Sequence, residues 1–206
     1  MRAKDVMTSP VITVSPATPV KAAAALLAAH GLTALPVVDD DERLVGIVSE
    51  ADVVRDRIPP DPRTRLYRDT SPSSPAPPTV GEVMTTPVSA VPAGADLADV
   101  ASMMLSEGIR SVPVVGGPRL VGIVTRRDLV RVLARDDAAI AADVRHRLEI
   151  YGGFDRWTVR VEHGVVTIED EFDDPSDQRV ARTLALAVPG AQDVRTPARQ
   201  LAEGRS

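Results

Sequence analysis

The sequence predicts a mixed α/β fold made of two copies of one small unit, followed by a smaller α+β unit. The first observation is a repeat, because residues 31–38 (GLTALPVV) return as residues 108–115 (GIRSVPVV). Residues 44–52 (LVGIVSEAD) likewise return as residues 120–128 (LVGIVTRRD). The second observation is that the repeat ends near Ala134, where the residue pattern changes. A match of this length indicates a duplicated unit, and two such units usually bury their apolar faces against each other.

The first half of each copy is expected to be a strand followed by a helix. In the first copy, residues 11–14 (VITV) form a β-branched run typical of a short strand. Thr18-Pro19 then offers an N-cap with proline at the first helical position, before an alanine- and leucine-rich helix over residues 21–30. Gly31 suits the C-cap, which favours a residue that tolerates a positive φ. The second copy places the equivalent helix over residues 96–107.

The second half of each copy is expected to be a hairpin followed by another helix. Residues 35–38 and 44–48 are apolar runs, and the four acidic residues 39–42 between them predict a polar turn. Ser49 or Asp52 then begins the last helix. Each copy therefore has the order strand, helix, strand, strand, helix.

The regions outside the two copies have distinct patterns. Residues 58–80 contain seven prolines and several serines, which favours an extended connector.

Residues 136–148 predict an amphipathic helix, and residues 157–168 alternate as a hairpin around a turn at residues 162–164. A second helix begins at Asp174-Pro175-Ser176 and ends at Pro189-Gly190, with a last short strand over residues 192–195. The C-terminal unit is therefore predicted as α, β, β, α with an added β-strand.

Composition narrows the classes of protein that fit. Hydrophobic residues make up 44% of the chain but aromatic residues only 2%, which predicts a globular core of aliphatic side chains. The net charge of −5 argues against a nucleic-acid surface. The absence of cysteine excludes disulfides and thiolate metal sites. No apolar leader and no run near eighteen apolar residues occurs, so we expect a cytoplasmic protein with no membrane partner.

Each copy places a hydroxyl and a carboxylate three residues apart at the predicted start of its last helix. These pairs are Ser49 with Asp52 and Thr125 with Asp128. Residues at this spacing lie on one helix face, where the carboxylate can accept hydrogen bonds from two ribose hydroxyls and the helix N-terminus favours phosphate. Ser49 and Thr125 suit the N-cap position equally well, so a purely structural role stays open.

The pattern G-x-x-x-x-P-V-V, a polar turn and L-V-G-I-V-[ST]-x-x-D, present twice in tandem, resembles a pair of CBS domains, the arrangement called a Bateman module. The resemblance covers roughly residues 3–134. It implies that the copies pack with pseudo-twofold symmetry, leave two clefts for adenine nucleotides or related adenosyl ligands, and pair further into homodimers. The predicted organisation is CBS repeat 1 (1–57), a Pro/Ser-rich linker (58–80), CBS repeat 2 (81–135), a C-terminal domain (136–196) and a flexible tail (197–206).

The resemblance also implies which residues line the two clefts, because each cleft draws its adenine-facing wall from one copy and its [ST]-x-x-D pair from the other. Arg110 of the second copy stands at the position that Thr33 holds in the first copy. The second cleft therefore has a fixed cation, which predicts tighter phosphate binding there. Arg126 or Arg127 could serve the first cleft in the same way. The first cleft would combine Val11, Ile12, Thr33, Ala34 and Pro36 with Thr125 and Asp128, and the second would combine Val88, Ser89, Arg110, Ser111 and Pro113 with Ser49 and Asp52.

The C-terminal unit resembles a BON domain over roughly residues 137–196. The matching features are its first helix, the hairpin at residues 164–167 and the helix end at residues 188–190. BON domains are known from periplasmic and membrane-associated proteins, where phospholipid binding has been proposed. The acidic residues 169–171 are poor partners for anionic headgroups, so we expect a protein or oligomer interaction module instead.

Taken together, these features predict a non-enzymatic regulatory or sensor protein that binds an adenine nucleotide and signals to a protein partner. The nucleotide (AMP, ADP, ATP or a related adenosyl compound) would be a regulatory ligand, with no cofactor required. His146 and His163 are far apart and form no metal-binding motif, and no catalytic or phosphate-loop motif occurs. The alternatives left open are a ligand-free dimerisation or interaction scaffold, a stand-alone nucleotide enzyme, and lipid-surface attachment through the C-terminal domain.

Overall fold

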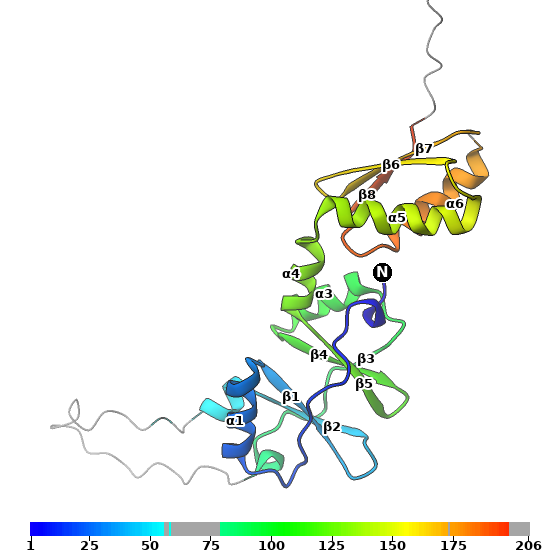
Figure 1. The fold of residues 1–206 in the computed structure, drawn as a ribbon. Helices are drawn as coiled ribbons and strands as arrows, with labels where there is room; N and C mark the ends of the chain where they lie inside the picture. The colour runs from blue at the N-terminus through cyan, green and yellow to red at the C-terminus, as the bar shows by residue number, and fades with distance from the viewer. Residues whose placement is uncertain (56–57, 59–78, 173, 198–206) are drawn as a thin grey trace, which may run out of the picture. The chain divides into compact units, whose positions relative to one another are not determined.

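The computed structural model describes residues 1–55, 58, 79–172 and 174–197 and divides into two compact units. The first unit spans Arg2–Arg126 and contains the first copy and the second copy up to its last helix, whereas the second begins at Arg127 and contains that helix and the C-terminal elements (Figure 1). Most of the predicted linker over residues 58–80 and nearly all of the predicted tail over residues 197–206 lie outside the described residues. No helix among the described residues is long and apolar enough to cross a bilayer.

The first copy contains the predicted helix, hairpin and second helix. Gly31 ends the first helix with a φ of 59°, the left-handed conformation expected of a C-cap glycine. Thr18 does not cap this helix, because Pro19 occupies the N-cap position and the Thr18 hydroxyl accepts from the Ser15 amide instead. The hairpin strands pair antiparallel, with one irregularity in register at the Val37–Val38 step. The elements are α1 (Val20–His30), β1 (Ala34–Val38), β2 (Leu44–Ser49) and α2 (Glu50–Val54).

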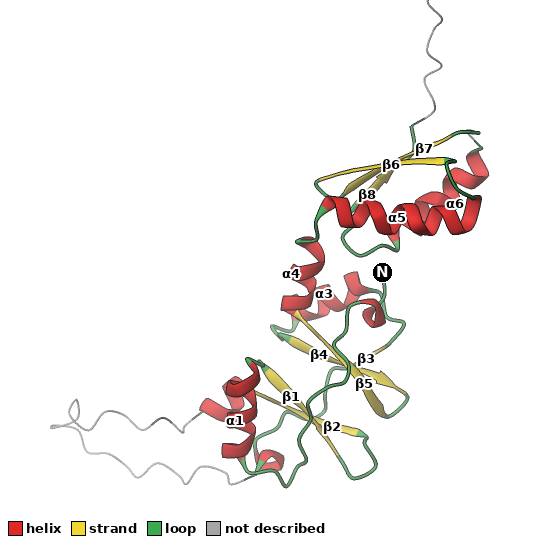
Figure 2. Cartoon of the chain, in the orientation of Figure 1, coloured by secondary structure: helices red, strands yellow, loops and turns green. Residues whose placement is uncertain are grey.

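The second copy repeats this order and adds a two-residue strand (Figure 2). Its sheet has the order β3-β4-β5, with β3 parallel and β5 antiparallel to β4. Asp96 caps α3, because its carboxylate accepts a hydrogen bond from the Ala98 amide. The elements are β3 (Val91–Pro92), α3 (Leu97–Ser106), β4 (Ser111–Gly116), β5 (Arg119–Thr125) and α4 (Arg126–Leu133).

The strand predicted over residues 11–14 is not formed. Only Val14 pairs there, in a single parallel bridge with Val37 of the first copy. Six residues earlier, Thr8 pairs with Ile123 of the second copy. The intervening residues must cross from one copy to the other, so they cannot follow the edge of one sheet for a full strand.

The two copies exchange short segments at their N-terminal ends. The 3-10 turn η1 (Ala3–Asp5) hydrogen-bonds to the second copy, where the Ala3 amide donates to the Ala95 carbonyl. The corresponding turn η3 (Val80–Glu82) belongs spatially to the first copy, where the Val80 amide donates to the Thr18 carbonyl. Val80 is fully buried in the apolar core of that copy. The sequence boundary at residue 81 therefore does not separate the copies in space.

Two methionine–glycine contacts accompany this exchange. Met7 packs over Gly122 in β5, and Met84 packs over Gly46 in β2. A β-carbon at Gly122 would overlap the Sδ and Cγ atoms of Met7. Glycine is therefore required at these positions because a neighbouring side chain approaches the backbone closely.

We expect Gly122→Ala to lower the free energy of unfolding by about 1–3 kcal/mol, the usual cost of overpacking a filled site. Urea denaturation followed by circular dichroism measures this change. Gly94→Ala is the matched control, because nothing lies within 4 Å of a β-carbon placed there. Equal stability of the two variants would show that Met7 moves aside without cost.

The C-terminal unit has the predicted α, β, β, α, β order. Its sheet has the order β6-β7-β8, with β7 antiparallel to β6 and parallel to β8. The aliphatic core includes Ile140, Val144 and Leu148 of the first helix, and Trp157, the single tryptophan of the chain, is buried against it. The elements are α5 (Asp137–Gly152), β6 (Trp157–Glu162), β7 (Val165–Asp170), α6 (Pro175–Leu186) and β8 (Asp193–Arg195).

The turn of the β6–β7 hairpin is formed by His163 and Gly164, whose φ angles are 51° and 76°. Two successive positive φ angles match the twist of the flanking strands. The Asp137 carboxylate accepts from both backbone amides, at 2.7 Å from His163 and 2.9 Å from Gly164. The start of α5 therefore holds the hairpin in place, and His163 has a structural role here.

Arg156 is the centre of a charged cluster at the other end of this hairpin. Its guanidinium donates two hydrogen bonds to the Asp170 carboxylate, at 2.8 and 2.9 Å, and another to Asp177. The guanidinium also lies over the Trp157 ring, 4.4 Å from its centroid. Hydrogen bonds from Arg156 lower the pKa of both Asp170 and Asp177, while the hydrogen bond to Asp177 raises the pKa of Tyr151.

The lowered carboxyl pKa values predict that this unit loses stability in acid. A carboxyl with a lower pKa in the folded state stabilises the fold above its unfolded value, about 4, and loses that contribution as pH falls through the folded value. We therefore expect the urea midpoint reported by Trp157 fluorescence to decline below about pH 4. In Asp170→Asn the decline over this range should be smaller. An identical decline in both proteins would assign the acid sensitivity to other groups.

Candidate functional site

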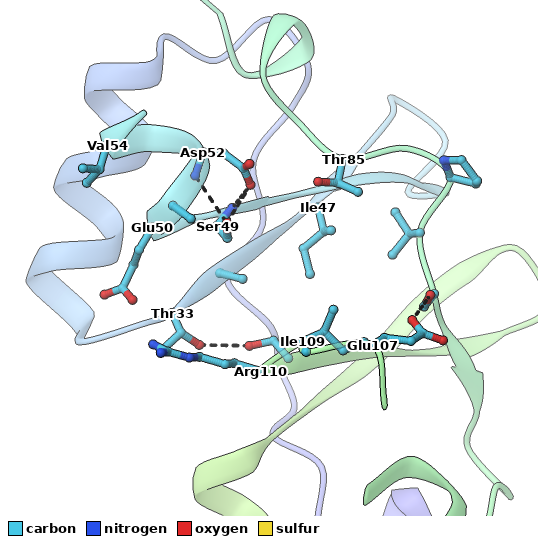
Figure 3. A pocket seen from close by; sticks show the side chains of 17 residues that line it. Thr33, Ile47, Ser49, Glu50, Asp52, Val54, Thr85, Glu107, Ile109 and Arg110 are labelled. Carbon is cyan, nitrogen blue, oxygen red and sulfur yellow. Dashed lines mark hydrogen bonds between the residues drawn. The ribbon is translucent and has the colours of Figure 1, made fainter. Parts of the chain in front are cut away.

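A cavity of about 690 Å³ lies between the two copies within the first unit. Its walls come from the start of β1, from β2 and α2 of the first copy, and from residues 85, 87–89 and 107–111 of the second (Figure 3). Small-molecule sites commonly occupy a few hundred to a thousand Å³ and combine apolar walls with a few polar groups. The cavity meets both conditions, because Ile47, Val88 and Ile109 line it beside Asp52 and Arg110.

The first-copy wall carries the hydroxyl–carboxylate pair. The Ser49 hydroxyl donates to Asp52 Oδ2 at 2.6 Å, and the Ser49 amide donates to the same oxygen at 2.9 Å. Ser49 is the N-cap of α2 and forms a capping box with Asp52, so the structural role left open for this pair is present. Asp52 is 9% exposed and lines the cavity. Its other oxygen, Oδ1, lies 3.9 Å from a guanidinium nitrogen of Arg55.

The second-copy wall carries the cation and two further hydrogen bonds. The exposed Arg110 side chain lies near Thr33, and the Thr33 hydroxyl lies 2.9 Å from the buried Ser111 hydroxyl (Figure 3). That hydrogen bond joins the copies across the floor of the cavity. On the opposite side, the Ser89 hydroxyl donates to the Glu107 carboxylate at 2.7 Å.

The structure brings together most residues predicted for the second cleft. Ser49, Asp52, Val88, Ser89, Arg110 and Ser111 all line the cavity, whereas Pro113 of the same set does not. Thr33 and Ala34, which the sequence assigned to the first cleft, line this cavity as well. They do so because β1 and β4 begin side by side, as the Thr33–Ser111 hydrogen bond shows.

Sequence reasoning missed two carboxylates in this cavity, Glu50 and Glu107. Glu50 directly follows the N-cap Ser49, so its position next to the predicted pair was a usable signal. Glu107 is the C-cap of α3, outside the repeated motif, and no sequence pattern marked it. Other lining residues outside the prediction are Ile47, Ala51, Val54, Thr85, Pro87, Gly108 and Ile109.

The residues predicted for the first cleft lie in several elements. Val11 and Ile12 lie on the segment that crosses from one copy to the other, and Ile12 is 37% exposed. In β1, the backbone carbonyl of Pro36 accepts a hydrogen bond from the Val14 amide. Asp128 in α4 is 5% exposed and forms a 2.9 Å ion pair with Arg131. Thr125 ends β5, and Asp128 belongs to the next compact unit. The first cleft therefore stays a prediction.

Arg126 has a structural role. Its guanidinium donates to two backbone carbonyls, that of Met104 within α3 at 2.7 Å and that of Ile109 beyond the end of α3 at 3.0 Å. This arrangement accounts for the side chain without a phosphate. Of the two arginines suggested for the first cleft, Arg127 is exposed.

Among the described residues, no group of three or more His, Asp or Glu side chains is placed to hold a metal ion.

Comparison with known families gives two matches to the CBS domain, over residues 3–58 and 80–135. The matched residues make up more than half of the chain and coincide with the two copies. Residues from 136 onward lie outside the match. Hypoxic response protein 1 of Mycobacterium tuberculosis is 32% identical over 133 residues, which cover 64% of this chain and 84% of that protein. An uncharacterized Methanocaldococcus jannaschii protein, MJ1404, is 35% identical, but the match spans only 31% of its length.

Two solved structures resemble the repeated part of the chain and contain ligands. CBSX2 in complex with AMP has 33% sequence identity and a TM-score of 0.53, and the match covers 63% of this chain and 93% of that one. The CBS domain pair of protein MJ0100, in complex with 5′-methylthioadenosine and S-adenosyl-L-methionine, has 29% identity and a TM-score of 0.52. That match covers 64% of this chain and 94% of the other.

Proposed function

The chain belongs to the CBS-domain family, and from this premise we propose that the cavity between its two copies binds an adenine nucleotide. The single observation that carries the proposal is the meeting of Asp52 and Arg110, from different copies, on the walls of one cavity. A carboxylate accepts hydrogen bonds from ribose hydroxyls, and a guanidinium suits phosphate. The ligands of CBSX2 and of protein MJ0100, AMP and two adenosyl compounds, support the same ligand class.

The ligand would act as a signal because the cavity is formed by both copies. A ligand that touches Asp52 on one copy and Arg110 on the other favours the arrangement in which the two lie at the right separation. Only such a difference in affinity between arrangements can shift their populations. The protein that responds to this shift, the homodimer, and the BON resemblance of the C-terminal unit stay predictions.

Thermal unfolding with a panel of nucleotides tests the proposal. The panel is AMP, ADP, ATP, NAD, S-adenosylmethionine and cyclic dinucleotides, and circular dichroism is the readout because Trp157 reports on the other unit. A ligand at about 100 times its Kd stabilises by about 2.7 kcal/mol, which raises the melting temperature by several degrees.

The matched variants are Asp52→Asn, which removes the carboxylate charge, and Asp40→Asn, an exposed site away from the cavity. We expect the nucleotide-dependent rise to be lost in the first variant and kept in the second. If none of the nucleotides raises the melting temperature of the unmodified protein, the CBS pair is better described as a ligand-free scaffold.

A further inference from the structure

The charged groups of the cavity point to a narrower ligand class. We propose that the cavity selects adenosyl ligands with no phosphate or one phosphate and disfavours the triphosphate. This inference rests on the function proposed above and adds a limit on ligand charge. Three carboxylates, those of Glu50, Asp52 and Glu107, line the cavity together with one guanidinium, that of Arg110.

The one cation of the described lining can match one phosphate group, whereas Arg55, beside Asp52, lies outside that lining. Among the described residues that line the cavity, Arg110 is the only lysine or arginine. A guanidinium binds one phosphate in a bidentate manner and neutralises part of its charge. A second and third phosphate would need further positive charge, and the other charged side chains of the described lining are all carboxylates.

The extra carboxylates lie on two sides of the cavity. Glu50, the first residue of α2, lies on the same side as Arg110, whereas Glu107 lies on the other side beside Ser89 (Figure 3). A phosphate chain extending past Arg110 therefore approaches Glu50, and a chain turned the other way approaches Glu107. Because the two carboxylates lie on different sides of the cavity (Figure 3), neither orientation of the ligand avoids both.

Like charges repel by an amount that depends on separation and local dielectric. Glu50 and Glu107 are exposed, so water and salt reduce this repulsion without removing it at low ionic strength. We expect a discrimination of about 10-fold or more between one and three phosphates, which is modest enough to be reduced measurably by single substitutions.

Isothermal titration with adenosine, 5′-methylthioadenosine, AMP, ADP and ATP, at low salt and without divalent cations, measures the order of affinity. We expect the affinity for AMP to be about 10-fold or more above the affinity for ATP, and the affinity for ADP to be intermediate. Glu50→Gln and Glu107→Gln should each tighten ATP binding more than AMP binding. Arg110→Gln should weaken AMP and leave adenosine nearly unchanged, and Asp40→Asn should behave as the unmodified protein.

The outcomes separate this inference from the function on which it rests. ATP binding as tightly as AMP, or an ATP affinity that neither glutamate variant changes, overturns the limit on charge and leaves nucleotide binding intact. Failure of all five compounds to bind, together with no rise in melting temperature from NAD, S-adenosylmethionine or cyclic dinucleotides, overturns the proposed function itself. The expected order, together with a smaller difference between AMP and ATP in the glutamate variants, supports both.

Discussion

Asp170→Ala is expected to lower the free energy of unfolding of the C-terminal unit by about 3–5 kcal/mol, because it leaves the Arg156 charge without its main partner. The Asp170 and Arg156 side chains are 1% and 13% exposed, so water cannot replace the lost carboxylate. Asp170 also accepts hydrogen bonds from the Phe172 and Asp174 amides, which would lose their acceptor. Urea denaturation followed by Trp157 fluorescence reports this unit directly.

Asp143→Ala is the matched control, because its ion pair with Arg135 joins side chains that are 52% and 26% exposed. A pair at that exposure contributes at most about 1 kcal/mol. If the two variants had the same urea midpoint, the Arg156 cluster would be a surface feature without a structural role. A double substitution of Arg156→Met with Asp170→Ala should recover part of the loss, because the unpaired charge is then absent.

The second large effect is expected in the unit that holds the cavity. Leu35→Ala should cost about 2–5 kcal/mol, because it removes a fully buried side chain and leaves a void that the neighbours fill only in part. Leu35 belongs to the core formed by β1, β2, α1 and Val80. Thermal and urea unfolding followed by circular dichroism measures the change.

Leu105→Ala provides the comparison for this site, because the Leu105 side chain on α3 is 72% exposed. A surface substitution of this kind usually changes stability by about 0.5 kcal/mol or less. A small effect of Leu35→Ala, comparable to that of Leu105→Ala, would contradict the packing described for the first copy.

The parts of the fold that follow local rules were predictable from the sequence. The repeat gave the order of elements, Gly31 marked the end of α1, and the turn at His163 and Gly164 was placed correctly. The exchange of N-terminal segments was not predictable. It depends on contacts such as Met7 with Gly122, which join residues more than a hundred positions apart and leave no periodic pattern.

The lining of the candidate site was predictable only in part from the sequence. The Ser49–Asp52 pair and Arg110 were assigned to one cleft by the resemblance to CBS domains, and they line one cavity. Glu107 was missed because it lies at a helix end that no motif marks. Thr33 was assigned to the other cleft, because sequence alone does not show that β1 and β4 begin side by side.

A crystal structure of the protein grown with saturating AMP would show directly whether the two copies bind an adenine nucleotide between them. We expect electron density for AMP in the cavity between the copies. The ribose hydroxyls should lie within hydrogen-bond distance of Asp52, and the phosphate should lie against Arg110. An empty cavity at saturating AMP, or AMP bound only elsewhere on the chain, would mean that this cavity is not the nucleotide site.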